Sequence, residues 1–548
     1  MKYGLKRFFF FILFIGAHQI QAQNWGWAVN GGGAGNDSYW AMKISKDKAH
    51  IYCAGPFEQT ITIGTTVLTS VGSSDVVLSK YDTAGTLVWA ERLGGGTGFD
   101  VASDMYEDDS SHLYISGVFN GKAVFGNDTL VAGGPGNCGF FAKYNSNGQQ
   151  IWIKQTKGSG TCFCGDICVD KVGNIILAGA FTDSLTIGGI SLFSKGSGDC
   201  FLAKLTPSGS VLWMQSAGGS GDDAIAGLNV DINNDIAITG WYANTAYFGS
   251  DTVTAIGPGA NIFVAKYTTS GTNKWVRTAG GIASSYGSWL ASDHKGNQYV
   301  VGYIGNSSVS FDTTSITCAG KTDIFIAKYD AMGNRKWVRR LGGPGFDESY
   351  YSVTDYDGNT FLTGRYTPYI PGNPIHNSEF LVAKYDSSGV MKWLKTATGL
   401  SSTFSESTEL SYDQFNNLFI AGNYSSTCVF NGDSIGCSGG WDMCLVKLHD
   451  STGIVNSIET YMQSYSLNVF PNPFSEYITM RIDGISNEEL TIVFIDVLGR
   501  EISSKKIKLE TDGHTEVLLT YPEAPKGLYF IQIRAPGSYA KGVKILKD

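Results

Sequence analysis

One short hairpin pattern returns seven times along the chain. Each copy has an apolar strand that ends in Lys and a turn, and six of the seven continue through Gly to a strand that carries Trp. The complete copies run from Lys to Trp over residues 80–89, 143–152, 204–213, 266–275, 328–337 and 384–393. Successive Lys residues are 63, 61, 62, 62, 56 and 63 positions apart, and the last is Lys447. A period of this length predicts an array of similar structural units.

Each period contains four strand-like runs, which the second copy shows well. Its runs cover residues 101–106, 113–119, 140–144 and 150–154, and polar turns with Asn, Ser and Gly separate them. Such residues suit tight turns because they tolerate positive φ or hydrogen-bond their own backbone. One four-stranded sheet cannot bury both of its faces alone, so it needs a neighbour on each side. Radial stacking supplies both neighbours, and we expect an all-β, seven-bladed β-propeller.

The two ends of this array are complementary. Lys447 has no Trp strand after it, whereas Trp27 has no Lys strand before it. We therefore expect the N-terminal strand to complete the last sheet and close the propeller. The Trp of each fourth strand would fill the wedge between neighbouring sheets, where burial of a large side chain contributes ~1.5–3 kcal/mol or more.

The first 22 residues have the order typical of an export signal. Three basic residues within the first seven precede an apolar run over 8–16 and a polar stretch that ends at Ala22, where cleavage is expected. A buried N-terminal helix is the alternative, and the order of charged and apolar residues favours export. Removal of the three basic residues changes the formal charge from −9 to −12. Nucleic acid and anionic lipid are therefore poor candidate partners, because they require basic patches.

Ten Cys residues in an exported chain make disulfides possible. Cys428 and Cys437 flank a turn at residues 430–433, so facing strands could bring the two side chains together, and this pair is our disulfide candidate. Three more Cys lie close in sequence, at Cys162, Cys164 and Cys168. No His lies near these three, and their spacing differs from the paired CxxC of zinc sites, so disulfides or buried thiols are favoured over a metal site.

The repeat stops near residue 457, and the composition changes there. Gly accounts for 6 of the last 92 residues, against 62 of the 434 residues from 23 to 456. Short alternating runs follow, which predict a small Ig-like β-sandwich. The expected organisation is a signal peptide at 1–22, the propeller at 23–456, a linker at 457–466 and a C-terminal domain at 467–548. No stretch after the N-terminus has the eighteen or so apolar residues that a transmembrane helix needs.

Four motifs occur in order in this tail. They are Leu-Asn-Val-Phe-Pro-Asn-Pro at 467–473, Ile-Asp-Val-Leu-Gly-Arg at 495–500, Lys-Gly-Leu-Tyr-Phe at 526–530 and Lys-Ile-Leu-Lys at 544–547. With them the tail resembles the C-terminal sorting domain of type IX secretion in Bacteroidota. The matching motif residues are Pro471, Asn472, Pro473, Gly499, Gly527, Tyr529, Lys544 and Lys547. The resemblance implies contact with the type IX secretion machinery, passage across the outer membrane, usual removal of the tail, and then surface attachment or release.

The clearest copy of the repeat is Phe380–Asp386, followed by Gly389 and Trp393. It resembles the SBBP family of seven-bladed β-propeller repeats, in which an apolar-Ala-Lys-Tyr-Asp run precedes Gly and Trp. The resemblance implies architecture alone, because propellers of this kind serve many roles.

Acidic residues recur where the chain enters the first strand of each period. They are Asp37, Asp100, Asp222, Asp223 and Asp347, with Glu406 at a looser spacing. First strands line the channel of a propeller, so these carboxylates could form a ring at its mouth that binds a ligand or Ca²⁺. The favoured alternative is that each Asp accepts hydrogen bonds from backbone N–H groups of the Gly-rich loop before it.

The sixth period is irregular, because a Pro-containing segment at 367–377 replaces the usual small hairpin. His376 is the one His placed where a general base could act, and no nucleophile motif accompanies it. The sequence therefore favours a secreted or surface-displayed, non-catalytic propeller that binds a glycan or a protein through its loops. A polysaccharide hydrolase or lyase with its site at the channel mouth is the alternative.

Overall fold

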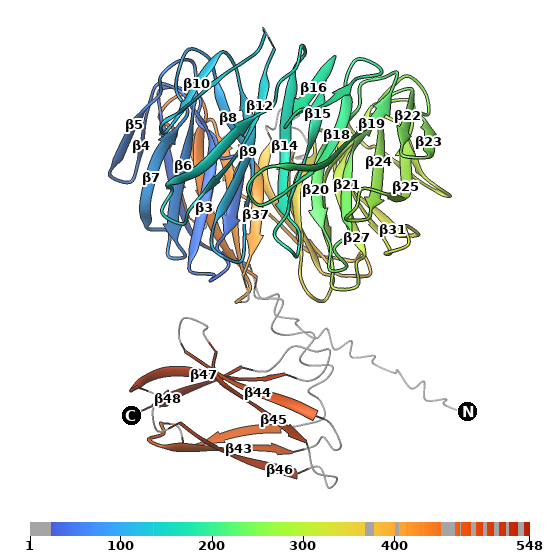
Figure 1. Cartoon of the computed structure of the whole chain (residues 1–548). Helices are drawn as coiled ribbons and strands as arrows, with labels where there is room; N and C mark the ends of the chain where they lie inside the picture. The colour runs from blue at the N-terminus through green and yellow to red at the C-terminus, as the bar shows by residue number, and fades with distance from the viewer. Residues whose placement is uncertain are drawn as a thin grey trace, which may run out of the picture. The chain divides into compact units, whose positions relative to one another are not determined.

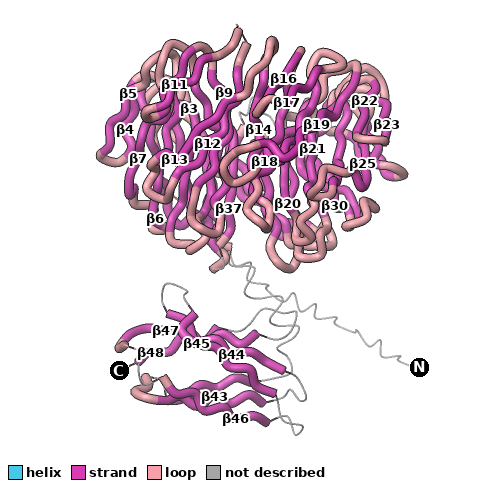
Figure 2. Tube along the Cα trace, in the orientation of Figure 1, coloured by secondary structure: helices cyan, strands magenta, loops and turns pink. Residues whose placement is uncertain are grey.

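The computed structural model describes most of the chain between residues 23 and 547. The residues outside this description are 1–22, 135, 368–377, 400–404, 414, 431, 451–465, 472, 484–488, 497–500, 509–513, 522–524, 535–541 and 548. The expected export signal and nearly all of the expected linker therefore lie outside it. The regular secondary structure of the described residues consists of β-strands alone, with no helix (Figure 2). The described residues include no helix with the length and apolar character needed to cross a membrane.

The chain divides into two compact units. The N-terminal unit runs from Trp25 to His449, and the C-terminal unit contains the segment from Asp450 to Asp548. This division lies close to the change in composition near residue 457.

In the N-terminal unit, the described strands form successive four-stranded antiparallel groups, which we number as repeats 1–7 (Figure 1). The first strands are β2 (Ala41–Ile44), β8 (Asp100–Glu107), β14 (Cys162–Val169), β20 (Ala224–Val230), β26 (Ser285–Ser292), β32 (Glu348–Thr354) and β37 (Ser405–Tyr412). The second strands are β3 (His50–Phe57), β9 (Leu113–Phe119), β15 (Ile175–Phe181), β21 (Ile236–Tyr242), β27 (Gln298–Gly305), β33 (Thr360–Tyr366) and β38 (Asn417–Tyr424).

The third strands are β6 (Asp75–Asp82), β12 (Cys138–Tyr144), β18 (Asp199–Leu205), β24 (Asn261–Tyr267), β30 (Thr322–Tyr329), β34 (Glu379–Tyr385) and β41 (Asp442–His449). The fourth strands of repeats 1–6 are β7 (Leu87–Leu93), β13 (Gln150–Gln155), β19 (Val211–Gly219), β25 (Asn273–Gly280), β31 (Arg335–Leu341) and β35 (Met391–Thr396). In repeat 7 the fourth place belongs to β1 (Asn24–Gly33), which is hydrogen-bonded to β41. The strand from the start of the described chain thus pairs with the end of the array, as the unmatched Trp27 and Lys447 predict.

Small hairpins connect the second and third strands of most repeats. They are β4–β5 (Thr60–Ile63, Thr66–Thr69), β10–β11 (Lys122–Phe125, Asp128–Val131), β16–β17 (Ser184–Ile187, Ile190–Phe193), β22–β23 (Thr245–Phe248, Asp251–Thr254), β28–β29 (Ser308–Phe311, Thr314–Thr317) and β39–β40 (Cys428–Phe430, Asp433–Ile435). Three of them extend the sheet of the preceding repeat: β4 pairs with β1, β22 with β19, and β28 with β25, whereas β39 pairs with β36 (Thr398–Gly399) in a separate three-stranded sheet. Neighbouring repeats are therefore joined by backbone hydrogen bonds.

The Trp residues lie at the boundaries between repeats. The indole Nε1 of Trp275 in repeat 4 donates a hydrogen bond to the carbonyl of Ala331 in repeat 5, at 3.2 Å. Trp27 makes the equivalent bond to Thr83 of repeat 1, at 3.3 Å, and so joins the two ends of the array. The turn glycine Gly85 has φ +87° and lies against the Trp27 ring, where an added Cβ would approach the ring to 3.0 Å. The Gly in the repeated pattern therefore gives the turn its positive φ and leaves room for the Trp.

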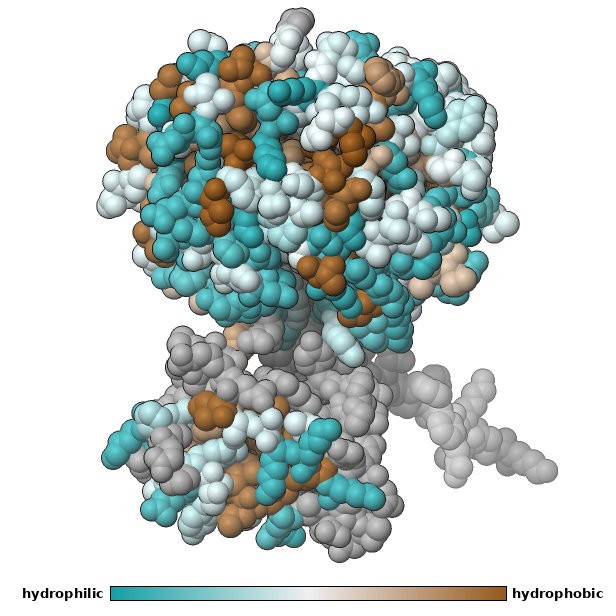
Figure 3. Space-filling model, viewed as in Figure 1, coloured by the Kyte–Doolittle hydropathy of each residue, from teal (hydrophilic) through white to brown (hydrophobic). Residues whose placement is uncertain are grey.

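The first strands contact one another in a closed order. Each packs against the first strand of the next repeat, and β37 packs against β2. At that last boundary, Thr408 Oγ1 donates to the carbonyl of Tyr39, at 2.6 Å. The second and third strands lie deeper in the packing, and every residue of β9 and β24 is buried. Burial on both faces explains why these strands are almost continuously apolar. On the face shown in Figure 3, exposed apolar side chains are scattered among polar ones.

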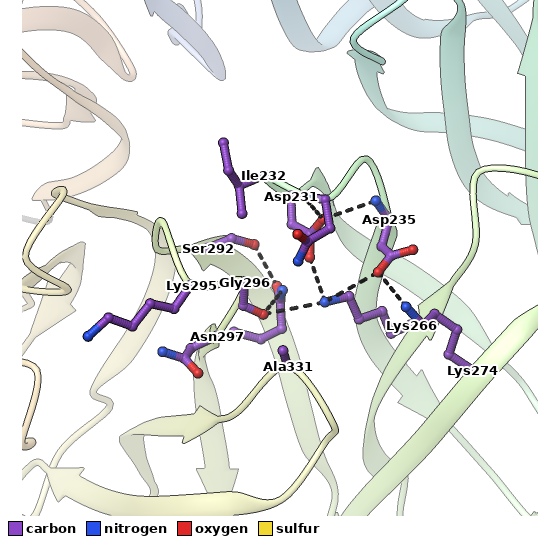
Figure 4. Close-up of polar contacts among 12 residues, drawn as sticks. Asp231, Ile232, Asp235, Lys266, Lys274, Ser292, Lys295, Gly296, Asn297 and Ala331 are labelled. Carbon is purple, nitrogen blue, oxygen red and sulfur yellow. Dashed lines mark hydrogen bonds and ion pairs between the residues drawn. The ribbon is translucent and has the colours of Figure 1, made fainter.

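The Lys of the repeated pattern has a structural role. Lys266 Nζ lies 2.5 Å from Asp231 Oδ2 in the β20–β21 turn and donates to the carbonyl of Gly296 in repeat 5, at 3.3 Å (Figure 4). Asp235 accepts from Lys274, at 2.6 Å, beside the same group. Equivalent pairs occur at Lys204–Asp170 (2.8 Å) and Lys143–Asp108 (3.5 Å). Lys266 therefore links the β20–β21 turn of its own repeat to a turn of the next repeat.

The C-terminal unit contains two antiparallel sheets. Their orders are β42–β43–β46 (Ser466–Phe470, Tyr477–Asp483, His514–Thr520) and β45–β44–β47–β48 (Glu501–Lys508, Glu489–Asp496, Gly527–Arg534, Gly542–Lys547). Residues of both sheets, such as Met480 and Phe494, share one hydrophobic cluster with Phe474.

Candidate functional site

Most of the Asp residues predicted at the starts of first strands are buried and hold loops. Backbone N–H groups four or five residues earlier donate to one carboxylate oxygen: Gly33 to Asp37 (2.8 Å), Gly95 to Asp100 (2.8 Å), Gly219 to Asp223 (2.7 Å) and Gly343 to Asp347 (2.7 Å). We call these four Asp the loop carboxylates. Their geometry favours the loop-holding role over a ligand or Ca²⁺ ring, because backbone donors occupy both carboxylate oxygens of Asp37, Asp223 and Asp347 and one oxygen of Asp100. Asp222, next to Asp223, is exposed instead.

Burial raises the pKa of every loop carboxylate. The pKa of Asp100 rises to about 7, because the group is desolvated and Asp75 lies nearby, and the pKa of Asp223 also rises to about 7. Asp37 and Asp347 rise to about 6 from burial and from the neighbouring carboxylates Asp442 and Asp323. Backbone hydrogen bonds oppose these rises and favour the ionised form. The four groups therefore titrate within the range of ordinary external pH.

The predicted His and Cys residues do not form a site within the described part of the chain. His376 lies outside the described residues. Cys428 and Cys437 are both free thiols, and the register pairs Cys428 with Ile435, two residues before Cys437, so the predicted disulfide is not formed in this structure. Cys162, Cys164 and Cys168 are likewise free and buried. Within the described residues, no group of three or more His, Cys, Asp or Glu is arranged to hold a metal ion.

The residues of the sorting motif are only partly described. Pro471 and Pro473 are exposed, and Gly527 begins β47. Tyr529 is buried, and its hydroxyl donates to the carbonyl of Pro525, at 2.6 Å. Lys547 donates to the carbonyl of Tyr521 and lies 5.7 Å from the centre of the Phe474 ring. Lys544 lies on β48, whereas Asn472 and Gly499 are outside the described residues.

A bulge interrupts the first strand of six repeats at the same level. The bulged residues are Ser103, Gly165, Ala226, Ser288, Tyr350 and Thr408, each two or three residues beyond the strand start. A bulge turns one side chain out of the regular alternation and is common beside binding sites. Because the first strands contact one another in a closed order, these bulges converge.

A cavity of about 220 Å³ lies where the bulges converge. Five of the six bulged residues line it, together with Trp40, Asp104, Asp166, Trp289, Tyr351 and Glu409 among others. We call it the bulge pocket. It draws on the first strands of six repeats and on Trp40, directly before β2.

Three buried carboxylates face this pocket. Asp104, Asp166 and Glu409, the pocket carboxylates, are 5%, 4% and 2% exposed. Asp104 accepts backbone hydrogen bonds from Met105 (2.7 Å) and from Ile167 of the next repeat (2.9 Å), and Glu409 accepts one from Met42. Asp166 Oδ2 and the second oxygen of Glu409, Oε1, have no hydrogen-bond partner among the described residues. Asp166 is therefore a buried acceptor that is open to a ligand.

Burial also dominates the electrostatics of the pocket. It raises the pKa of Asp104 to about 6 and raises the pKa of Asp166 and Glu409 well above the usual range. Repulsion between Asp104 and Asp166 adds to the rise at Asp166. Lys43 opposes the rise at Asp104 and Glu409, and its Nζ donates to the Tyr351 hydroxyl, at 3.2 Å. Lys43 thus supplies one positive charge near three pocket carboxylates.

Aromatic side chains form part of the pocket wall. Trp40 is 47% exposed, which is unusual for so large an apolar side chain. Trp289 and Tyr351 stack with ring centres 4.1 Å apart. The Tyr350 hydroxyl lies within hydrogen-bond distance of Glu348 (3.1 Å) and Glu406 (3.2 Å) and can donate to either, so the looser acidic position of the sequence also lies beside the pocket wall. The pocket therefore combines flat apolar faces with hydrogen-bond acceptors, a combination that fits small polar ligands.

Sequence reasoning missed the pocket carboxylates. A signal existed, since Asp104 interrupts the apolar run 101–106 and Asp166 interrupts the run of β14. Asp104 and Asp166 each lie four residues beyond the first residue of their strands, β8 and β14. Acids at the same position in two successive repeats are expected at the same height along neighbouring first strands.

Comparisons with known proteins bear on both units. Residues 468–547 match the family described as the secretion system C-terminal sorting domain. Over 363 residues the chain is 23% identical to an uncharacterized WD repeat-containing protein of Acanthamoeba polyphaga mimivirus. The matched region covers 53% of this chain and 26% of the relative. The chain thus matches about a quarter of that relative's length.

A solved structure, a member of the DUF4221 family from Bacteroides vulgatus, shows 10% identity with a TM-score of 0.30, over 62% of this chain and 92% of the other. The family match is the informative finding. Since such a domain directs its protein through the type IX secretion system, this chain is a β-repeat protein with a C-terminal sorting domain that is exported to the cell surface or secreted.

Proposed function

We propose that the N-terminal unit is a seven-bladed β-propeller of SBBP type, closed by its N-terminal strand, with an export signal at 1–22. The pairing of β1 with β41 and the closed order of first-strand contacts support this proposal. The proposed domains are the propeller at 23–456, the linker at 457–466 and an Ig-like sandwich at 467–548.

Removal of the Trp27 side chain tests the closure. Trp27→Ala should lower the free energy of unfolding by about 3 kcal/mol, as removal of a packed Trp does. Trp275→Ala, at an internal boundary, is the matched control and should cost a similar amount. Urea unfolding of both variants measures this. A Trp27→Ala variant as stable as the parent would contradict closure by β1.

For the function, we propose that the exported propeller binds a glycan without catalysing its cleavage, and that the bulge pocket holds part of it. The observation that carries this proposal is the open buried acceptor, Asp166 Oδ2, beside the aromatic walls of Trp40 and Trp289. The apolar face of a sugar ring packs on an aromatic side chain, and its hydroxyl groups donate to carboxylates.

A glycan-array screen of the full chain, followed by calorimetry on the glycans that bind, tests this function. Trp40→Ala and Asp166→Asn should each weaken binding about tenfold or more, because each removes about 1.4 kcal/mol or more of interaction. Asp222→Asn, an exposed acid at the strand start, is the matched control and should bind as the parent does. Equal affinity in all four proteins would place the glycan elsewhere.

A hydrolase is the second candidate, because one specific observation favours it. Glycosidases use pairs of carboxylates, one with a raised pKa as the acid, and burial raises the pKa of all three pocket carboxylates. Reducing-end assays on the glycans that bind would distinguish the two functions. Product formation that Glu409→Gln abolishes would establish the hydrolase, and binding without product supports the non-catalytic function.

A further inference from the structure

We infer that the bulge pocket recognises an ammonium group, so that its ligand is an amino sugar or the amino-sugar end of a glycan. This inference rests on the proposed glycan-binding function and adds the chemical class of the ligand. It follows from three properties of the pocket: its charge, its open acceptor and its aromatic walls.

The charge of the pocket favours a cation. Asp104, Asp166 and Glu409 supply three buried carboxyl groups, and Lys43 lowers the pKa of two of them. Carboxylates removed from water need either a proton or a cation nearby. An ammonium group that enters the pocket supplies the missing positive charge.

The open acceptor fits the same group. Asp166 Oδ2 is buried and has no hydrogen-bond partner among the described residues, and the residue lines the cavity. An ammonium group has three N–H donors, and a hydrogen bond between two charged partners is roughly twice as strong as one between neutral groups. A neutral hydroxyl satisfies the oxygen without balancing its charge. The geometry therefore prefers an amine over an alcohol at the same ring position.

The walls and the size of the pocket narrow the ligand further. Trp40 and Trp289 line the cavity, and a cation within about 6 Å of a Trp ring is attracted to its face. The cavity of about 220 Å³ is smaller than the roughly 300–1,000 Å³ of pockets that hold drug-sized ligands. That space suits one sugar ring rather than several, so a terminal residue is the part that enters.

Ammonium binding should also depend on pH. The groups around Asp166 are Asp104 of β8, Cys168 of β14, Lys43 of β2, Tyr351 of β32 and Glu409 of β37. Burial raises the pKa of the carboxyl groups, so they hold protons at low pH that an incoming ammonium must displace. The affinity for an amine should therefore increase as the pH rises from 5 to 7, whereas the affinity for a neutral sugar should not.

Calorimetry of the full chain with D-glucosamine, D-glucose and N-acetyl-D-glucosamine tests the inference. We expect D-glucosamine to bind at least about tenfold more tightly than either neutral sugar, and Asp166→Asn to remove this preference. Near-ultraviolet circular dichroism checks the fold of the variant, and Glu409→Gln is a second variant that should reduce the preference. Equal affinities for D-glucosamine and D-glucose would overturn the ammonium inference and leave the glycan function standing. If neither these sugars nor any glycan of the array binds the folded protein, both proposals fail.

Discussion

Two sets of buried carboxylates, the loop carboxylates at or just before the starts of first strands and the pocket carboxylates beside their bulges, differ in their partners. Each loop carboxylate accepts a backbone hydrogen bond from the Gly-rich loop before it, and Asp223 accepts a second one from Ala243. Beside the bulge of β14, Asp166 has an oxygen with no partner among the described residues and lines the cavity, whereas the one unpartnered oxygen of a loop carboxylate, on Asp100, belongs to a residue outside the pocket lining. The comparison teaches that burial alone does not mark a binding site. A buried acid that accepts backbone hydrogen bonds from a loop holds structure, whereas one with an unpartnered oxygen on a cavity wall is available to a ligand.

Truncation of a loop carboxylate should have the largest effect. Asp223→Ala removes the acceptor of Gly219 N–H and Ala243 N–H and leaves both donors buried. We expect the free energy of unfolding to fall by about 3 kcal/mol, because two hydrogen bonds to a charged group contribute ~1.5–3 kcal/mol each.

The neighbouring Asp222 provides the matched control for that experiment. It is exposed, so Asp222→Ala should change stability by no more than about 0.5 kcal/mol. Urea denaturation of both variants measures the difference. Equal stability of the two variants would show that loop holding is not what the buried Asp contributes.

The pH dependence of stability should come next in size. The folded-state pKa of Asp100 and Asp223 is about 7 and that of Asp37 and Asp347 about 6, against an ordinary value of 3.8. The folded protein therefore binds protons more tightly than the unfolded chain, and this stabilisation is lost as the pH rises through 6–7. Melting followed by circular dichroism should show a Tm several degrees lower at pH 8 than at pH 5.

A variant at one loop carboxylate isolates the source of this pH dependence. Asp100→Asn keeps an acceptor for Gly95 N–H and no longer titrates, so the difference in Tm between pH 5 and pH 8 should shrink. A difference unchanged from the parent's would assign the dependence to other groups.

Local patterns made much of the fold predictable. The expected runs 113–119 and 150–154 coincide with β9 and nearly with β13, because polar turns bracket each run and the strands between them are apolar. The unmatched Trp27 predicted that β1 completes the last repeat, since the period leaves one place empty there. Counting the members of a regular array thus gives long-range pairing that local propensity does not.

The pocket was not predictable in the same way. Asp104 and Asp166 are 62 residues apart and meet only because two bulges turn neighbouring strands toward one cavity. No residue type marks a bulge in these strands, since the bulged positions hold residues as different as Ser103 and Tyr350. For the predicted Cys428–Cys437 pair, the turn sets the register of the short β39–β40 hairpin, and that register places Ile435, not Cys437, opposite Cys428.

The stability of Asp166→Asn tests the central contrast most directly. If the buried Asp166 carboxyl is kept for a ligand, its neutral amide should stabilise the unliganded protein at pH 8, because burial raises the pKa of Asp166 and so makes its ionised form unfavourable in the folded state. Asp223→Asn should destabilise the protein under the same conditions. An Asp166→Asn variant that unfolds more easily than the parent would show that Asp166 holds structure as the loop carboxylates do, and would contradict the account.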